Sequence, residues 1–238
     1  MRGPRGRIGV VTPTYLDSAE DWFQIVPDGV NVVFATLGVE EHTSNEFDKA
    51  RAAVERSARG LIKMGVGAVL LGGSPLVTLQ DGKGAADLAP QLEKATGVPV
   101  TTGQDAAETA LNALGVGKLL LVTPYKETLN AGMQRRLAAH GFEVLALKTA
   151  LCPGPDEMTR LSPEVPLGLA RAAYREAPKA DGFYIPNPKW QTLEIIEALE
   201  REFNIPVVTT TQSSAWWCLK AIKIKAARPG YGRLMELL

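Results

Sequence analysis

The chain has 238 residues, of which 45% are hydrophobic and 22% are charged. These values are ordinary for a folded globular protein and exclude a disordered or fibrous chain. The 26 basic residues balance 26 acidic ones, so no net charge attracts the protein to nucleic acid or to an anionic membrane. No apolar run reaches the roughly 20 residues of a membrane span, and the N-terminus lacks the apolar core of a signal peptide. We therefore expect a cytoplasmic protein without nucleic-acid or membrane partners.

Metal and disulfide sites are not expected from the cysteine and histidine content. The two cysteines, Cys152 and Cys218, are too few for a disulfide scaffold and fit a reducing compartment. The two histidines, His42 and His140, are far apart and lack ligand spacing. A structural zinc site is therefore improbable, and we predict no metal.

Short runs rich in leucine or β-branched residues alternate with longer stretches of helical period along the chain. This alternation is typical of parallel βαβ units and predicts the α/β fold class. The expected strands cover residues 7–12, 30–36, 68–72, 98–101, 118–123, 143–147, 182–185 and 207–210. They fall into two sets of four.

The two sets resemble each other, which indicates an internal duplication. The segment IGVVTP over 8–13 recurs as LLLVTP over 119–124, displaced by 111 residues at the proline. The segment VPVT over 98–101 recurs as IPVV over 205–208, displaced by 107 residues at the proline. The similar displacements support the duplication.

Each set also closes with a Thr-rich turn that leads into a helical pattern. The turn TTGQD over 101–105 precedes a predicted helix over 106–114, and TTTQS over 209–213 precedes one over 215–224. Ser, Thr and Asp are good N-caps, so both turns are suited to start a helix.

A binding site is expected at the carboxyl ends of the predicted strands. Ligands of open parallel sheets bind there, because loops and helix N-termini offer unpaired N–H groups. Two such edges facing one another would make a cleft that is hydroxyl-rich and poor in charge. Its expected lining comprises residues 13–15, 72–75, 123–125, 186–189 and 209–212.

Five segments carry a more specific pattern. They are LGVGKLLLVTPY over 114–125, the pair Leu129-Asn130, TLEIIEALE over 192–200, IPVV over 205–208 with Gln212, and PGYGRL over 229–234. In this order and spacing they resemble the arylmalonate decarboxylase and maleate isomerase branch of the aspartate/glutamate racemase superfamily. The resemblance covers nearly the whole chain. It implies two four-stranded, flavodoxin-like lobes that are flanked by helices and related by a pseudo-twofold.

The resemblance also implies an activity. Such enzymes need no cofactor, bind a carboxylate through hydroxyls and backbone amides, and pass through an enediolate that these donors stabilise. We therefore expect a decarboxylase or isomerase of a small carboxylic or dicarboxylic acid. The first lobe is expected over residues 1–108, completed by 213–238, and the second over 109–212. A homo-oligomer is expected from the family alone, because no sequence feature demands it.

The chain departs from the family at its cysteines, which lie at the end of the third strand of each lobe. At these places it has Gly-Gly-Ser over 72–74 and Asn187. Neither Cys152, in a proline-rich loop, nor Cys218, inside the last helix, matches a catalytic position. An amide neither supplies a proton nor attacks carbon at neutral pH. Thiol-based racemisation is therefore disfavoured. Pro188 also lacks the backbone N–H that the family uses in its oxyanion hole, so at least one family donor is absent.

Four residues are the predicted catalytic candidates: Tyr125, Ser74, Asn187 and Lys189. The Tyr125 hydroxyl could donate to a carboxylate or enediolate, or the ring could simply be packed. The Gly-Gly-Ser turn lets N–H groups approach a ligand, or is only a tight turn. Asn187 could orient a substrate or serve as a turn residue. Lys189 could act as acid or base in a desolvated cleft, although lysines beside turns are usually exposed.

The remaining candidates have weaker support. Tyr15 mirrors Tyr125 through the repeat. Lys126 is a second acid or base candidate, and His42 could carry a proton, although Ser44 followed by Glu46 rather indicates a helix start. The tryptophans are explained by core packing. The expected substrate-binding residues are Gly72, Gly73, Pro13, Thr14, Tyr15, Thr123 and Pro188.

Two other interpretations stay open. The missing cysteines favour a protein that has kept the carboxylate-binding cleft and lost the chemistry. A lyase or hydrolase could instead use Lys189 or His42 as a non-cysteine acid or base.

Overall fold

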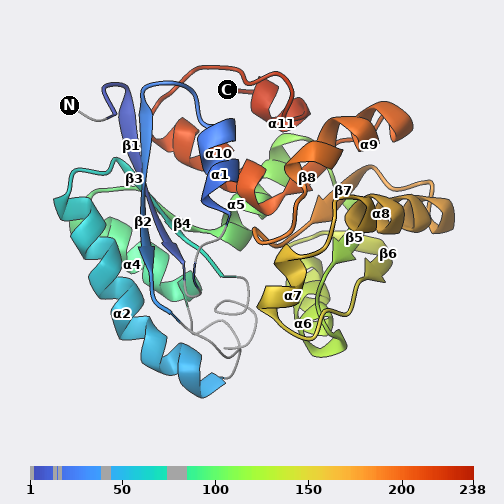
Figure 1. The fold of residues 1–238 in the computed structure, drawn as a ribbon, viewed down its shortest axis with the longest axis horizontal. Helices are drawn as coiled ribbons and strands as arrows, with labels where there is room; N and C mark the ends of the chain where they lie inside the picture. The colour runs from blue at the N-terminus through green and yellow to red at the C-terminus, as the bar shows by residue number, and fades with distance from the viewer. Residues whose placement is uncertain (1–2, 13–14, 16–17, 39–43, 74–84) are drawn as a thin grey trace. The chain divides into compact units, whose positions relative to one another are not determined.

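A computed structural model gives the fold and describes residues 3–12, 15, 18–38, 44–73 and 85–238, with the backbone alone for 44–51, 85, 86 and 155. Within these residues, eight strands form two four-stranded sheets in which every strand pair is parallel (Figure 1). Helices follow the strands in both sheets. The predicted α/β class with two similar sheets is therefore confirmed.

The chain divides into two compact units. The first contains Met1–Ala106, Ser214–Ala226 and Leu238, and the second contains Ala107–Ser213 and Ala227–Leu237. The boundary falls inside two helices, α5 (Gly103–Ala113) and α10 (Thr210–Ala221). The expectation that residues 213–238 complete the first lobe stays a prediction.

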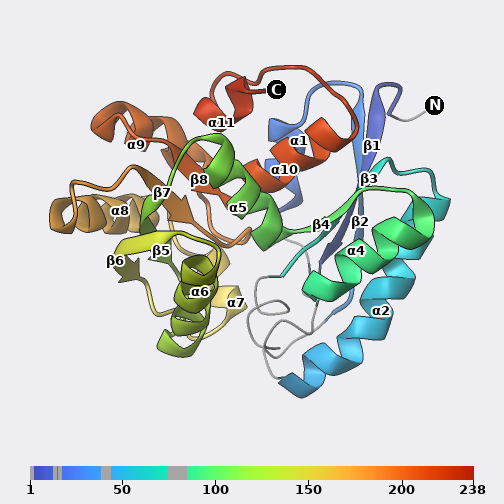
Figure 2. The same ribbon diagram turned by 180° about the vertical axis from the view of Figure 1, so that it is seen from behind.

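The first sheet has the strand order β2-β1-β3-β4. Helices α2 and α4 lie on one of its faces, and α1 lies on the other (Figures 1 and 2). The elements are β1 (Gly6–Thr12), α1 (Ala19–Ile25), β2 (Val30–Thr36), α2 (Ser44–Lys63), β3 (Ala68–Leu71), α4 (Ala85–Thr96) and β4 (Val100–Thr102).

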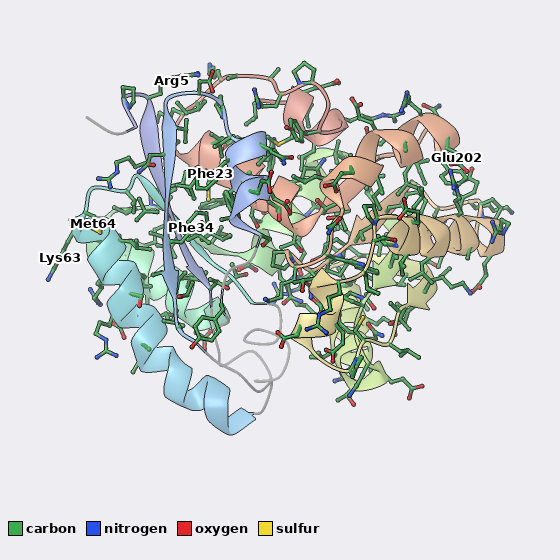
Figure 3. All side chains as sticks on the ribbon, viewed as in Figure 1. Arg5, Phe23, Phe34, Lys63, Met64 and Glu202 are labelled. Carbon is green, nitrogen blue, oxygen red and sulfur yellow. The ribbon has the colours of Figure 1, made fainter. Side chains whose placement is uncertain are left out.

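Apolar side chains fill both faces of the first sheet. Under α2 and α4, the buried side chains of Leu61, Leu71 and Leu92 belong to one core cluster. On the other face, the ring of Phe34 in β2 meets Trp22 and Phe23 of α1 edge-on, at centroid distances of 6.3 and 6.0 Å. Figure 3 labels Phe34 and Phe23. Burial of this apolar surface stabilises the unit.

The second sheet has the order β6-β5-β7-β8, the same topology as the first. The stretch from Leu119 to Val122 in the central strand β5 is fully buried, as expected for a parallel strand covered on both faces. The elements are β5 (Lys118–Thr123), α6 (Glu127–Ala139), β6 (Glu143–Thr149), α7 (Pro155–Thr159), α8 (Glu164–Glu176), β7 (Gly182–Ile185), the 3₁₀ turn Leu193–Ile195, α9 (Ile196–Phe203), β8 (Val207–Thr209) and α11 (Arg233–Glu236).

Two helices begin earlier than the sequence predicted. Helix α5 begins at Gly103 instead of 106, and α10 begins at Thr210 instead of 215. Helix α10 begins at Thr210 because Gln212 Oε1 accepts the Thr209 N–H at 3.1 Å, which makes Thr209 the N-cap residue. Helix α10, which contains Cys218, is also not the last one, because α11 follows it.

No helix in the described part of the chain combines the length and the hydropathy that a membrane-crossing segment needs.

Candidate active site

Side-chain hydrogen bonds fix the backbone that leaves β5. The Tyr125 carbonyl accepts from Asn130 Nδ2 at 2.9 Å and from Thr149 Oγ1 at 2.6 Å. Thr123 Oγ1 donates to Asn130 Oδ1 at 2.7 Å. Thr123 and Tyr125 are buried, at 0% and 2% exposure. Such a satisfied buried network fixes the backbone at Tyr125, and it serves a packed tyrosine equally well.

The segment after β6 lies against the end of β5. The backbone N–H of Cys152 donates to the Pro124 carbonyl at 2.8 Å, and that of Ala150 donates to the Thr123 carbonyl at 2.9 Å. Desolvation by burial raises the pKa of the Cys152 thiol, and the charge of Glu157 raises it further. This cysteine therefore stays a thiol at neutral pH.

Asn187, which follows β7, has an unusual backbone conformation. Its φ is 108°, in the region that favours glycine and that asparagine tolerates better than most residues. Its N–H donates to Thr210 Oγ1 at 2.9 Å, and its Oδ1 accepts the Lys189 N–H at 2.7 Å. Its Nδ2 lies 2.9 Å from Met158 Sδ. The backbone N–H and the side-chain amide of Asn187 thus all contact other protein atoms.

The end of β8 places further hydroxyls at this edge of the sheet. Because β7 and β8 are adjacent parallel strands, Thr210 lies beside residues 186–189, which follow β7 and are called the Asn187 loop below. Thr209 Oγ1 is buried without a hydrogen-bond partner among the described residues, and so is Trp190 Nε1. A buried polar atom without a partner is uncommon and is usually satisfied by water or a ligand.

The structure therefore brings together the predicted residues of the second unit. Thr123 and Tyr125 leave β5, Asn187 leaves the neighbouring strand β7, and all lie at the carboxyl edge of one sheet. Pro188 and Lys189 are half-buried at the same edge. Their roles in binding and catalysis stay predictions.

The predicted residues of the first unit are described only in part. The Gly72 N–H donates to the Val11 carbonyl at 2.7 Å, and a Cβ on Gly72 would lie 3.1 Å from the same oxygen. Gly73 has φ of 99°, and the Tyr15 side chain is 64% exposed. Gly72 is therefore favoured by the close approach of the Val11 carbonyl and Gly73 by its positive φ, independently of any ligand. Pro13, Thr14, Ser74 and the weaker candidate His42 lie outside the described residues.

Two threonines support the site: the sequence interpretation missed Thr149 and named Thr210 only as part of the expected lining 209–212. Thr149 Oγ1 holds the Tyr125 carbonyl, and Thr210 Oγ1 holds the Asn187 N–H. Both end or follow a strand, which is the only signal that could have drawn attention to them. Their partners lie 24 and 23 residues away in the sequence, so no local pattern reveals the contacts.

Across the residues that the structure describes, no three His, Cys, Asp or Glu side chains form a group that could hold a metal ion. Cys218 is buried in α10, where desolvation raises its pKa. Its thiol is therefore not a nucleophile at neutral pH.

Known proteins share this fold and part of this sequence. The arylmalonate decarboxylase of Bordetella bronchiseptica is 29% identical over 231 residues, which are 96% of this chain and 96% of that protein. The maleate isomerase of Nocardia farcinica (strain IFM 10152) is 28% identical over 138 residues, 58% of this chain and 54% of the isomerase. A crystal structure of an arylmalonate decarboxylase double mutant in the liganded form superposes with a TM-score of 0.87 at 29% identity, covering 96% of this chain and 98% of the other.

The match to the family as a whole is equally extensive. Residues 8–235 match the family described as arylmalonate decarboxylase. The agreement of sequence, fold and length over nearly the entire chain shows that this protein belongs to the arylmalonate decarboxylase family.

Proposed function

We propose that this protein is a cofactor-independent enzyme that acts next to the carboxylate of a small carboxylic or dicarboxylic acid, by decarboxylation or isomerisation. Family membership over residues 8–235 is the observation that carries the proposal. The hydroxyl and amide groups at the carboxyl edge of the second sheet support it, because charge on an enediolate is stabilised by preorganised donors of this kind.

In the decarboxylation, the bond between the α-carbon and one carboxylate breaks. Carbon dioxide leaves, and the electron pair of the broken bond forms the enediolate on the remaining carboxylate. Tyr125 and Ser74 donate hydrogen bonds to this group in the proposal. Asn187 shapes the loop and orients the substrate, and the half-buried Lys189 delivers the proton to the α-carbon as a general acid. Gly72, Gly73, Tyr15, Pro13, Thr14, Thr123 and Pro188 complete the proposed substrate contacts.

The test is turnover of an arylmalonate and of maleate by the purified protein, with formation of the monocarboxylic acid or of fumarate followed by chromatography. Tyr125→Phe removes the hydroxyl and keeps the ring. We expect it to lower kcat by about 10²–10³, the cost of one lost donor to a developing oxyanion.

Tyr174→Phe is the matched control. The half-buried Tyr174 stacks on the half-buried Phe203 with ring centroids 4.1 Å apart, and its substitution should leave kcat within about twofold, because it has no part in the proposed charge stabilisation. Equal kcat for Tyr125→Phe and the unsubstituted protein would remove Tyr125 from the proposal.

A second candidate function is carboxylate binding without chemistry. It is favoured by the hydrogen bonds of Asn187, whose polar groups already contact Thr210, Lys189 and Met158, and by the raised pKa values of both thiols. It predicts calorimetric binding of a malonate with no product after long incubation. Any enzyme-dependent product rules it out.

A further inference from the structure

Gln212 joins the last strand of the second unit to the C-terminal segment 227–237. Its side chain is fully buried. Its Oε1 accepts the Thr209 N–H at 3.1 Å, and its Nε2 donates to the Tyr231 carbonyl at 2.6 Å. Both ends of one amide therefore bond to backbone groups that lie far apart in the sequence.

The turn that Gln212 holds also holds the Asn187 loop. Thr209 is fixed at its N–H by Gln212 and at its carbonyl by Ser213 Oγ, at 2.7 Å. The next residue, Thr210, accepts the Asn187 N–H at 2.9 Å. Because Asn187 has φ of 108°, a conformation that persists only where the surroundings fix it, this hydrogen bond helps to define the loop.

The C-terminal segment is itself tightly seated. Gly232 has φ of +79°, and a Cβ there would lie 2.4 Å from Ile196 Cγ2 and 3.0 Å from Gln212 Nε2. Glu200 Oε2 accepts the Arg233 N–H at 2.9 Å. The segment thus presents the Tyr231 carbonyl to Gln212 from a fixed position.

We propose that Gln212 is a positioning residue that transmits the seating of the C-terminal segment to the Asn187 loop through Thr209 and Thr210. The expected effect of Gln212 on kcat rests on the proposed function. Its structural consequence, the fixed Asn187 N–H, is independent of any turnover.

The test compares Gln212→Ala with Asp105→Ala. Asp105 occupies the same helix position in the first repeat and exchanges hydrogen bonds with Thr102 in its helix cap, so its loss weakens the corresponding cap of the first unit. Gln212→Glu is the second variant; it keeps the acceptor for Thr209 and loses the donor to Tyr231, and it serves if the alanine variant does not fold.

Kinetics are measured at a temperature where every variant is folded by circular dichroism. We expect both Gln212 variants to lower kcat by about 10- to 100-fold, the range that follows from a small misplacement of a reacting group. KM should change less than threefold, and Asp105→Ala should keep kcat within twofold. An unchanged kcat in both folded Gln212 variants, or an equal loss in Asp105→Ala, overturns the proposal.

Hydrogen exchange of the Asn187 amide, followed by NMR, gives a result even if the unsubstituted protein turns over none of the acids. The amide should exchange at least about tenfold faster in the Gln212 variants and less than threefold faster in Asp105→Ala, because local exchange reports local opening. Equal exchange in all variants overturns the positioning role. Absence of turnover with accelerated exchange supports it and counts against the proposed function alone.

Discussion

Two corresponding stretches of the repeat, 93–105 and 200–212, share a hydrogen bond and differ in what surrounds it. In the first unit, Glu93 accepts the N–H of Val100 at 3.2 Å, and Glu93 is exposed. In the second, Glu200 accepts the N–H of Val207 at 3.0 Å, and Glu200 is buried at 7% exposure. The difference arises because Glu200 also binds the C-terminal segment through its second oxygen.

The helix caps of the two stretches differ in the same way. Thr102 Oγ1 accepts the Asp105 N–H at 3.1 Å and donates to Asp105 Oδ2 at 2.6 Å, which closes the cap on itself. In the second unit, Gln212 bonds to Tyr231, and Thr209 Oγ1 is left without a partner in the described structure. The second copy of the repeat therefore uses the side chains of Glu200 and Gln212 to seat a distant segment, whereas Asp105 of the first copy exchanges hydrogen bonds with Thr102.

The seating of the C-terminal segment can be broken at Gly232. Gly232→Ala should destabilise the protein by about 3 kcal/mol or more, because a positive φ and overpacking act together. Gly230→Ala is the matched control: Gly230 also has positive φ, with no atom within 4 Å of an added Cβ, and should cost only about 1 kcal/mol. Urea denaturation measures the free energy of unfolding of both variants. Equal losses of stability would contradict the prediction, because the Ile196 side chain would then move away from the added Cβ without an energetic cost.

The caps can be compared by removing one hydroxyl from each. Thr102→Val should cost about 1–2 kcal/mol, the value of an N-cap. Thr209→Val should be neutral or slightly stabilising, because it removes a buried hydroxyl that has no partner among the described residues. Guanidinium denaturation of the two variants checks the contrast. A loss above about 1 kcal/mol for Thr209→Val would reveal a partner for that hydroxyl.

The two glutamates should differ in the pH dependence of stability. Desolvation by burial raises the pKa of Glu200, against the lowering effect of its backbone donors and Arg233. A raised folded pKa means that the folded state holds the proton more tightly, so this contribution to stability is present below the unfolded pKa and is lost as the pH rises through the folded pKa.

We therefore expect the free energy of unfolding of the unsubstituted protein, minus that of Glu200→Gln, to become smaller as the pH rises from 4 to 7. Thermal unfolding at a series of pH values measures this difference. Glu93→Gln is the control, and it should change the free energy of unfolding by less than about 0.5 kcal/mol, as most exposed substitutions do. An advantage over Glu200→Gln that grows with pH would contradict the assignment.

The smallest effect concerns the cysteines, one in each unit. Cys152 and Cys218 are both buried, and burial raises the pKa of each thiol. The charge of Glu157 adds to the raised pKa of Cys152, so Glu157→Gln should accelerate its alkylation by iodoacetamide at pH 8 by a few-fold. Mass spectrometry distinguishes the sites, and Cys218 should react only on unfolding. An unchanged Cys152 rate would show that access, not charge, limits the reaction.

The sequence predicted the strands well and the supporting contacts poorly. The runs at 30–36, 118–123 and 182–185 coincide with β2, β5 and β7, because buried parallel strands are continuous apolar runs that a sequence displays directly. The start of α10 was missed since Gln212 caps it while bonding to Tyr231, a contact across 19 residues that no local pattern encodes.

In the candidate site, too, the sequence predicted the positions of residues better than their contacts. Residues at strand ends could be named from the pattern, and Tyr125 and Asn187 do lie at one sheet edge. What each side chain bonds to depends on elements distant in the sequence, so the anchoring by Thr149 and the contact between Asn187 and Met158 could not be foreseen.

The left-handed backbone at Asn187 limits which residues this position accepts. Glycine fits without steric cost, and asparagine or aspartate fits with little, whereas most other L-residues, cysteine included, incur roughly 1–2 kcal/mol there. Re-engineering a thiol into this loop would therefore start from a conformational handicap. A designer would have to reshape residues 186–189 together, not exchange one side chain.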